Sequence, residues 1–438
     1  MGEGPLHHGR APVPVVRSGF ETRPADWLGV DEALARILAD ATPLPPEPCP
    51  LIHCLGRALA EDVVAEATLP PWDNSAMDGF AVRGTDVAGA TVDAPVRLRV
   101  VRRVRAGDGP GPEFAAGEAV GIMTGAPLPP GADTVVRVED TDAEAEPGTV
   151  LVRNDRDVGH NVRPAGQDVR RGERLLGKGH TITPGTVGVL AAAGRAEALV
   201  HGRPTVAVLT TGDELRGPDR FDEVRAGRGV PDSNGPMVAA LVAATGVTPL
   251  PLGTALDDPH DLRARMLSAR DADVLVTIGG ASMGEADLVK RVLDELGYRP
   301  GFWRVRMRPG SPIGFGFLPR GDRLQPVLSL PGNPTSAFVT FEVLARPLLL
   351  RLAGHERTDR RTVVARASEP IRAPARLTYF LRVALEGSGS SLSARLTGPQ
   401  GSGLVSGLAR AGGLVVIGEE VAGIEEGQPV TVLLLGDR

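Results

Sequence analysis

Between residues 204 and 352, short apolar runs typical of β-strands alternate with segments that have the spacing of amphipathic helices. Consecutive strands joined by helices run parallel, because a parallel pair needs a long crossover connection. We therefore predict a three-layer α/β domain here, with a central parallel sheet covered by helices on both faces. The four strand-like runs are PTVAVLT, VTPLPLGTA, ADVLVTIGG and QPVLSLPG.

The rest of the 438-residue chain is patterned differently, so we expect a multidomain protein that combines α/β and β units. Short β-like runs separated by Gly and Pro predict a small β domain, and a second group of such runs near the end predicts a C-terminal β-barrel. Two segments flank the small β domain, and we expect them to form one discontinuous connecting domain. The expected boundaries are a disordered extension at 1–25, the connecting domain at 26–68 and 158–203, the small β domain at 69–157, the α/β domain at 204–352 and the barrel at 353–438.

Two helical segments fall within the expected connecting domain. VDEALARILADA, residues 30–41, places its apolar side chains on one face and has Asp31 in its first turn. TPGTVGVLAAAG, residues 183–194, is apolar throughout. We expect these two helices to pack together and so to join the two separated segments.

Composition narrows the classes of function. The net charge of −6 gives no reason to expect a nucleic acid partner, because binding to the phosphate backbone requires a basic face. No apolar run approaches the roughly 20 residues of a membrane-spanning helix, and the N-terminus lacks the apolar core of a secretory signal. These features predict a cytoplasmic protein that does not enter a membrane. Cys49 and Cys54 are the only cysteines, and we expect both to be reduced, partly buried thiols. If the protein handles a soft metal, the thiolates must come from its ligand.

Unusual polar residues follow each strand of the α/β segment. In open α/β sheets, ligands bind at the carboxyl ends of the strands, so we expect these residues to form one shared ligand site. Acids that precede helices also serve as ordinary caps, and this alternative applies to each loop taken alone. The residues are Thr210, Thr211, Gly212, Asp213 and Glu214 after the first strand; Asp257 and Asp258 after the second; Gly279, Gly280, Ser282, Gly284, Glu285 and Asp287 after the third; and Gly332 and Asn333 after the fourth.

These loops imply a site that binds both an anion and a cation. Glycine-rich turns that lead into helices offer backbone N–H groups to a phosphate or another oxyanion. The carboxylates would repel that anion unless a divalent cation lay among them, so a phosphate bridged by Mg²⁺ fits best. The chain has no GxxxxGK[ST] sequence, and GGASMG lacks the GxGxxG spacing, so neither a P-loop nor a dinucleotide fold is supported.

Positive charge comes from FWRVRMRPGSPIGFG, residues 302–316. Arg304, Arg306 and Arg308 alternate along it, so on a strand they would share one face. Alternating arginines on an exposed edge strand can also serve only to keep the protein soluble. Because the neighbouring loops have the character of anion-binding loops, we favour a functional role.

Seven motifs occur in one order: PPWDNSAMDGFAV, IMTGAP, TTGDEL, DSNGPM, GGASMGEAD, RPGSP and SLPGNPTSA. Because it carries these motifs in this order, the chain resembles the molybdopterin molybdenumtransferase family (MoeA, and the E-domain of gephyrin) from about residue 26 to its C-terminus. The resemblance implies that the α/β domain binds molybdopterin and that the protein is an elongated homodimer. It also implies that the DNSAMDG loop reaches across the dimer and presents Asp78, with Thr124 nearby, to the ligand of the other subunit.

The resemblance implies the insertion of molybdate into adenylylated molybdopterin, with Mg²⁺-dependent release of AMP. The dithiolene of the pterin would supply the soft sulfur ligands. The molybdopterin adenylyltransferase is a candidate partner. The implied catalytic and Mg²⁺-binding residues are Asp78, Glu214, Asp257 and Asp287. The implied residues that contact the pterin nucleotide or the oxyanion are Thr124, Thr211, Gly212, Asp213, Ser233, Asn234, Gly279, Gly280, Ser282, Gly284, Arg304, Arg308, Pro331, Gly332 and Asn333.

The chain departs from the family at RPGSP, where KPGKP is common. Arg308 stands in for the first lysine and Ser311 for the second, and an arginine fork is not equivalent to a lysine point charge at an anion site. The main alternative is therefore a non-catalytic carrier or scaffold of the same fold. Two further alternatives are adenylylation of molybdopterin by ATP, and a phosphohydrolase that acts on simple nucleotides.

Overall fold

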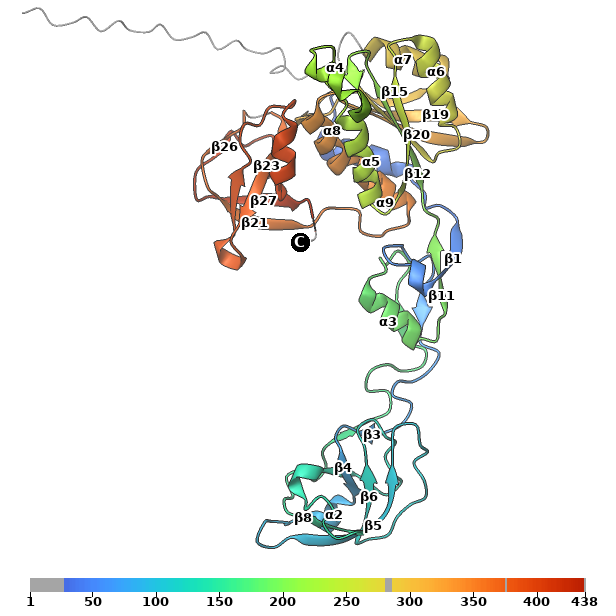
Figure 1. Ribbon diagram of the computed structural model, residues 1–438, viewed down its shortest axis with the longest axis vertical. Coiled ribbons are helices and arrows are strands. Elements are labelled where there is room, and N and C mark those ends of the chain that lie inside the picture. The colour runs from blue at the N-terminus through green and yellow to red at the C-terminus, as the bar shows by residue number, and fades with distance from the viewer. Residues whose placement is uncertain (1–26, 280–285, 375, 437–438) are drawn as a thin grey trace, which may run out of the picture.

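The computed structural model describes residues 27–279, 286–374 and 376–436. The chain forms an elongated molecule, with an α/β unit and a C-terminal barrel at one end and a small β unit at the other (Figure 1). A slender connecting unit lies between them. This arrangement confirms the multidomain α/β plus β fold class. The extension expected at 1–25 lies outside the described residues.

The α/β unit is built on a six-stranded sheet with the order β15-β12-β16-β20-β19-β17. The first four strands are parallel, as predicted, whereas β19 and β17 add an antiparallel edge that the sequence did not predict. The strands are β12 (Thr205–Thr211), β15 (Thr248–Ala255), β16 (Val274–Ile278), β17 (Arg299–Phe302), β19 (Gly314–Arg320) and β20 (Arg323–Leu330). A short excursion after β12 contains β13 (Leu215–Arg216), η3 (Pro218–Arg220), α4 (Phe221–Arg225) and β14 (Val230–Pro231).

Helices cover both faces of this sheet, as expected. The predicted helix after β20 is one continuous helix with a π-helical segment in its middle. On one face lie α5 (Asn234–Ala244), α8 (Pro334–Thr340), η4 (Phe341–Ala345) and α9 (Arg346–Leu352). On the other face lie α6 (Pro259–Ser268) and α7 (Ala286–Glu295). Each face buries its own apolar cluster, so the sheet is shielded from water on both sides.

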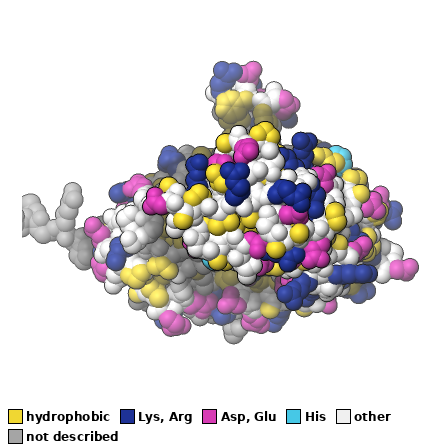
Figure 2. Space-filling model, turned by 90° about the horizontal axis from the view of Figure 1, so that it is seen from below, with side chains coloured by type: hydrophobic (Ala, Val, Ile, Leu, Met, Phe, Trp, Pro, Cys, Tyr) yellow, Lys and Arg dark blue, Asp and Glu magenta, His cyan; other side chains and the backbone are white. Residues whose placement is uncertain are grey.

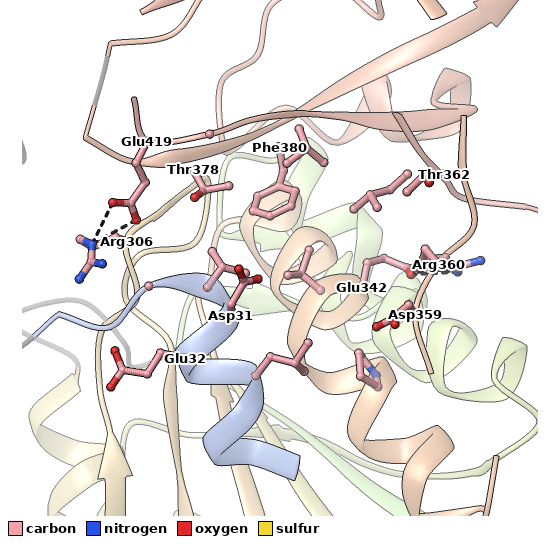
Figure 3. Close-up of a pocket in the computed structure, with 18 residues that line it drawn as sticks. Asp31, Glu32, Arg306, Glu342, Asp359, Arg360, Thr362, Thr378, Phe380 and Glu419 are labelled. Carbon is pink, nitrogen blue, oxygen red and sulfur yellow. Dashed lines mark hydrogen bonds and ion pairs between the residues drawn. The ribbon is translucent and has the colours of Figure 1, made fainter. Parts of the chain in front are cut away.

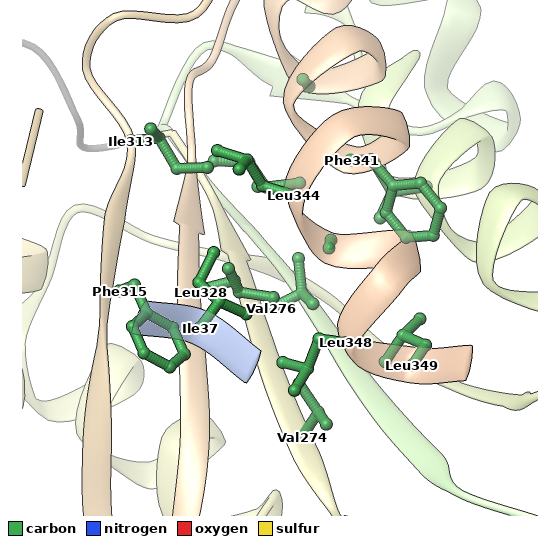
Figure 4. Close-up of a cluster of buried hydrophobic side chains, with 14 of the residues drawn as sticks. Ile37, Val274, Val276, Ile313, Phe315, Leu328, Phe341, Leu344, Leu348 and Leu349 are labelled. Atoms are coloured by element: carbon green, nitrogen blue, oxygen red, sulfur yellow. The ribbon is translucent and has the colours of Figure 1, made fainter. Parts of the chain in front are cut away.

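Helix α1 (Val30–Ala39) also belongs to this core. Ile37 is buried against Phe315 and Leu348, from the sheet and from α9 (Figure 4). The predicted contact between this helix and α3 (Pro184–Ala192) is therefore wrong. Amphipathic spacing shows that a helix buries one face, but it does not identify the surface that covers that face.

The connecting unit is formed by two separated segments of the chain. Strands from the two segments pair antiparallel, and α3 packs over a small apolar cluster that includes Cys49 and Cys54. Both thiols are buried and free, as predicted. The elements are β1 (Pro46–Pro50), η1 (Leu51–His53), β2 (Val63–Val64), β10 (Arg174–Leu176), α3 and β11 (Glu197–His201).

The small β unit is a five-stranded sheet with the order β7-β4-β6-β5-β8, and it confirms the four strands expected from the sequence. Seen from its end, it shows basic and acidic side chains interspersed (Figure 2). Arg97, Arg99 and Arg103 of β5 each pair with a glutamate, so they do not form a free positive face. The elements are β3 (Asn74–Ser75), β4 (Gly79–Val82), α2 (Gly84–Val87), β5 (Val96–Val104), β6 (Glu118–Ile122), β7 (Thr134–Arg137), η2 (Val138–Asp140), β8 (Thr149–Val152) and β9 (Val162–Arg163).

The C-terminal unit is a closed barrel of five strands, because β23 pairs with both β24 and β25 and the intervening strands complete the ring. All five correspond to predicted strands. They are β21 (Thr362–Ala367), β23 (Thr378–Glu386), β24 (Ser393–Leu396), β25 (Gly413–Ile417) and β27 (Pro429–Leu434), with β22 (Ile371–Arg372), η5 (Gly389–Ser391), η6 (Val405–Arg410) and β26 (Gly423–Ile424) between them. Strand β18 (Met307–Arg308) leaves the α/β unit and pairs with β23. None of the helices in the described part of the chain combines the length and the apolar character that crossing a bilayer requires.

Candidate functional site

Four parallel strands of the α/β sheet end level with one another. Thr254, Thr210, Ile278 and Leu330 pair across β15, β12, β16 and β20 in a single row. The chain passes from β12 to β15 on one side and then returns to β16 on the other side, so the order of strands reverses between β12 and β16. Such a reversal leaves a crevice at the carboxyl ends of the strands, and this is where ligands bind in open α/β sheets.

A cavity of about 550 Å³ opens at this crevice. Eight of the predicted site residues line it, so the loops from β12, β16 and β20 converge as expected. They are Thr210, Thr211, Glu214, Ser233, Asn234, Gly279, Gly332 and Asn333. The volume is within the range of pockets that hold small organic ligands.

Gly279 allows two of these loops to approach closely. Its φ of +97° lies in the region that favours glycine, and a Cβ atom there would lie 2.8 Å from the carbonyl oxygen of Thr211. The N–H of Gly279 donates to the carbonyl of Leu330 at 3.2 Å. A side chain at this position would therefore force the loops after β12 and β16 apart.

Asp232 holds one wall of the cavity together, and the sequence analysis did not single it out. One of its carboxylate oxygens accepts from the hydroxyls of Thr210 and Thr254, at 3.0 and 3.3 Å. The other accepts from the backbone N–H groups of Asn234 and Gly235, at 3.1 and 2.9 Å, at the start of α5. Its place directly before a helix, within the DSNGPM motif, is the signal that could have identified it.

Asn234 connects the wall of the cavity to the loop after β20 by a hydrogen bond. Its Nδ2 donates to the carbonyl of Gly332 at 2.6 Å, whereas its Oδ1 is buried and has no hydrogen-bond partner among the described residues. A buried acceptor without a donor is costly, and Asn234 lines the cavity. This atom is therefore suited to accept a hydrogen bond from a bound ligand.

Three of the expected carboxylates gather at the same edge of the sheet. The N–H of Asp257 donates to Asp213 at 2.9 Å and the N–H of Asp213 donates back to Asp257 at 3.3 Å, so the two loops brace each other. Glu214 lines the cavity, and its carboxylate also lies beside Gly212. Asp258 instead caps α6 through two backbone N–H groups, which is the ordinary role considered above for such acids.

These carboxylates supply the hard oxygen ligands that Mg²⁺ prefers. No group of three or more His, Cys, Asp or Glu residues within the described ranges has the geometry of a metal site. Asp287, another residue expected to bind Mg²⁺, lies in the first turn of α7, and its side chain is outside the described structure. Gly280, Ser282 and Gly284 also lie outside the described residues.

A second cavity, of about 370 Å³, adjoins the first and shares Asn333 with it. Its lining includes the predicted residues Arg304, Arg308 and Pro331, together with Ser311. The hydroxyl of Ser311 is buried and donates to the carbonyl of Met307 at 2.6 Å. This position therefore adds no charge to the cavity.

The three alternating arginines do not share one face, so that expectation is wrong for one of them. Arg306 points into a different cavity, where it forms an ion pair with Glu419 at 3.1 Å (Figure 3). Its guanidinium also donates to the carbonyl of Trp27. The backbone does not form a regular strand through all three positions, because only Met307–Arg308 is strand, and so strict alternation fails.

Arg304 and Arg308 differ from Arg306 in their pairing. In the described part of the chain, neither has a carboxylate partner or a side-chain hydrogen bond. Two guanidinium groups that have no counter-charge within the described ranges line one small cavity, and the most direct consequence is an affinity for an anion.

The C-terminal barrel completes this second cavity, which the sequence analysis did not predict. Gln400, Gly401 and Ser402 line it from the loop after β24. Arg382, which is buried, holds this loop to α8 by donating to Thr335 Oγ1 at 2.6 Å and to the carbonyl of Pro399 at 2.8 Å. The GPQGSG sequence of the loop is a turn signal, but turn composition does not show what the turn approaches.

Asp78 and Thr124 lie together in the small β unit. The carboxylate of Asp78 accepts from the backbone N–H of Thr124 at 2.7 Å and from its hydroxyl at 2.9 Å. These two donors hold the pKa of Asp78 below its usual value, so the side chain is a carboxylate at neutral pH. Within one chain, the connecting unit separates this pair from the two cavities (Figure 1).

Three family models match the chain in sequence. They are the MoeA N-terminal region (domain I and II) at 28–194, a probable molybdopterin binding domain at 207–351, and the MoeA C-terminal region (domain IV) at 364–435. A molybdopterin molybdenumtransferase of Synechococcus elongatus is 37% identical over 83% of this chain and 89% of its own length. Molybdopterin molybdenumtransferase 2 of Mycobacterium tuberculosis is 37% identical over 87% of this chain and 93% of its own. The crystal structure of a molybdopterin biosynthesis moeA protein from Pyrococcus horikoshii superposes with a TM-score of 0.80 at 27% identity, covering 93% of this chain and 100% of that one.

Proposed function

The chain belongs to the molybdopterin molybdenumtransferase (MoeA) family, and we propose that it inserts molybdate into adenylylated molybdopterin and releases AMP. The product is the molybdenum cofactor. The observation that carries the proposal is the pair of adjoining cavities, which share Asn333. One fits a polar organic ligand, and the other presents two arginines that have no carboxylate partner among the described residues.

We assign the pterin nucleotide to the cavity at the ends of β12, β16 and β20. Asn234 Oδ1 would accept a hydrogen bond from the ligand, and the backbone at Gly279 and Gly332 lets the ligand lie close to the chain. Thr211 and Ser233 add hydroxyls to the lining. The dithiolene of the ligand supplies the sulfur that binds molybdenum, which agrees with the burial of Cys49 and Cys54 in the connecting unit.

We assign molybdate to the arginine cavity. It is a dianion, and Arg304 and Arg308 can each offer several N–H donors to its oxygens. Because the two cavities adjoin at Asn333, the oxyanion would lie beside the pterin nucleotide. Ser311 contributes no charge, so the attraction for the anion would come from the two arginines.

We assign a Mg²⁺ role to the carboxylates at the sheet edge. Glu214 and Asp257, with Asp287 of α7, would hold the ion, which would neutralise phosphate charge when bound. Asp213 acts on Asp257 through their reciprocal hydrogen bonds and so fixes the loop that carries it. Cleavage of the adenylate breaks the phosphoanhydride bond and forms a new bond from phosphorus to the attacking oxygen, so charge neutralisation and positioning are the main requirements.

We further propose that the working unit is a homodimer. Asp78 and Thr124 are held in a fixed arrangement, but in one chain they lie far from the cavities (Figure 1). A second copy related by twofold symmetry would bring the small β unit of one subunit to the α/β unit of the other. The proposal places the protein in the cytoplasm, and the molybdopterin adenylyltransferase would deliver its substrate there.

The experiment is AMP release from purified protein given adenylylated molybdopterin and Mg²⁺, with and without molybdate. We expect molybdate to stimulate release and chelation of Mg²⁺ to abolish it. Tight pterin binding without AMP would identify a carrier instead. AMP release from simple nucleotides in the absence of pterin would identify a phosphohydrolase. Either result would overturn the proposal.

A further inference from the structure

Arg304 has one close contact that bears on its function. Its guanidinium carbon lies 5.1 Å from the centre of the Trp27 ring, within the range of a cation–π contact. Trp27 is 5% exposed, so the ring is fixed by its surroundings. It precedes α1 and is remote in sequence from every residue assigned to the site above.

The backbone around Trp27 is paired with the backbone around Arg304. Leu28 bridges Val305 in parallel fashion, and its N–H donates to the carbonyl of Arg304 at 3.4 Å. The N–H of Arg306 donates to the carbonyl of Leu28 at 2.8 Å. The segment before α1 is therefore fixed directly to the segment that carries the arginines.

Arg304 and Arg306 are restrained in different ways. Glu419 pairs with the Nε of Arg306, and the carbonyl of Trp27 accepts from its Nη1, so the charge of that side chain is already neutralised by a carboxylate. The Trp27 ring attracts the guanidinium of Arg304 through its π face and leaves both the charge and the N–H donors in place. A contact of this kind can orient a cation without competing with the anion that the cation binds.

We propose that Trp27 is a positioning residue that orients Arg304 for oxyanion binding. This inference rests on the proposed role of the arginine cavity in binding molybdate. Without the ring, the long side chain of Arg304 samples other rotamers, and binding must restore the productive one at an entropic cost. The segment before α1 thereby becomes part of the oxyanion site, although none of the seven sequence motifs extends to it.

The test is direct binding of molybdate to the full-length protein, measured by equilibrium dialysis with metal analysis and no pterin present. We expect Trp27→Leu to weaken binding about three- to tenfold, the range that cation–π contacts support. Trp27→Phe keeps an aromatic face and is expected to retain most of the affinity. Thermal unfolding of both variants is recorded alongside.

A double-mutant cycle separates positioning from a general structural effect. In an Arg304→Gln background, Trp27→Leu should have no further effect on molybdate affinity, because the side chain it orients is gone. An equal loss in both backgrounds would overturn the proposal. If Trp27→Leu does not fold, the three tryptophans can be replaced biosynthetically by a fluorinated analogue, which weakens the π face and keeps the shape. Unchanged affinity with that analogue would also overturn it.

The outcomes distinguish this inference from the function on which it rests. If the wild-type protein does not bind molybdate, the oxyanion role of the cavity fails, and the role of Trp27 fails with it. If the wild-type protein binds molybdate and Trp27→Leu binds it equally well, only the positioning role fails.

Discussion

The α/β unit and the small β unit carry their parts of the proposed site in different ways. In the α/β unit, loops that are far apart in sequence meet because four parallel strands end in one row. In the small β unit, Asp78 and Thr124 bind each other, and no hydrogen bond within the described ranges joins them to another predicted site residue. The sheet and the adjoining loop of the barrel thus build the ligand cavities within one chain. The homodimer proposed above would bring the Asp78 loop of one chain to the cavities of the other.

The Asp78 loop is nevertheless well ordered. The N–H of Gly125 donates to the carbonyl of Ser75 at 2.8 Å, and the Ser75 hydroxyl accepts from the N–H of Met77 at 3.2 Å. These bonds fix the turn before Asp78 and connect it to the loop that carries Thr124. A loop held in this way can present a carboxylate to a partner at little entropic cost.

The largest expected effect comes from removing one carboxylate from either unit. Glu214→Gln and Asp78→Asn should each lower the rate of AMP release by about 1,000-fold, because each removes a carboxylate expected to hold the Mg²⁺ that neutralises the reacting phosphates. Steady-state rates at saturating molybdate and Mg²⁺ measure the effect.

The matched control is Asp93→Asn, an exposed aspartate in the small β unit, which should leave the rate unchanged. If Asp78→Asn behaved like this control, the Asp78 loop would have no part in the reaction, and the two units would not share a site.

A smaller effect, on the pH dependence of stability, is expected at the junction between the connecting unit and the α/β unit. His355 lies after α9, and its Nδ1 hydrogen-bonds to Thr181 Oγ1 at 2.7 Å, across the junction. Burial, followed by the charges of Arg346 and Arg57, lowers the pKa of His355 from 6.5 to about 4. The neutral form is therefore the one that the folded junction favours.

The pH dependence follows from this shift. The unfolded chain binds a proton at His355 below about pH 6.5, whereas the folded chain does so only near pH 4. The contribution of His355 to the free energy of unfolding is fully present above pH 6.5. It falls as the pH drops toward 4, by up to about 3 kcal/mol. The free energy of unfolding, measured by chemical denaturation between pH 7.5 and 4.5, should fall less steeply with decreasing pH in His355→Gln than in the wild-type protein. The control His53→Gln, at an exposed histidine, should follow the wild-type curve, and identical curves for all three proteins would refute the assignment.

Much of the α/β fold could be predicted because its central strands are β-branched runs and its helices have clear spacing. Strand β19, which lies between β20 and β17, could not, because it contains Gly314 and Gly316. Their Cβ positions would lie 2.4 Å from the Trp303 ring and 2.5 Å from the Tyr298 ring, respectively. Glycine is required there by tertiary packing, and packing of this kind overrides strand propensity.

The same limit applies to the site. Residues at the carboxyl end of a strand, such as Thr211 and Gly279, could be placed because sheet geometry is regular. The separate roles of Arg306 and Arg308 could not, since they depend on Glu419 in the barrel, 113 positions along the chain from Arg306. Only the resemblance to a family predicted that Asp78 acts at the cavities. We propose that it does so from the other chain of a dimer.

The most direct test of a site shared between subunits is a mixed dimer. Asp78→Asn and Glu214→Gln chains, carrying different affinity tags, are co-expressed, and the species bearing both tags is isolated by two successive purifications. One of its two sites would then combine an intact α/β unit with an intact Asp78 loop, so AMP release should recover to about half that of the wild-type dimer. Activity no higher than that of the parent variants would show that each chain works alone and would contradict the account.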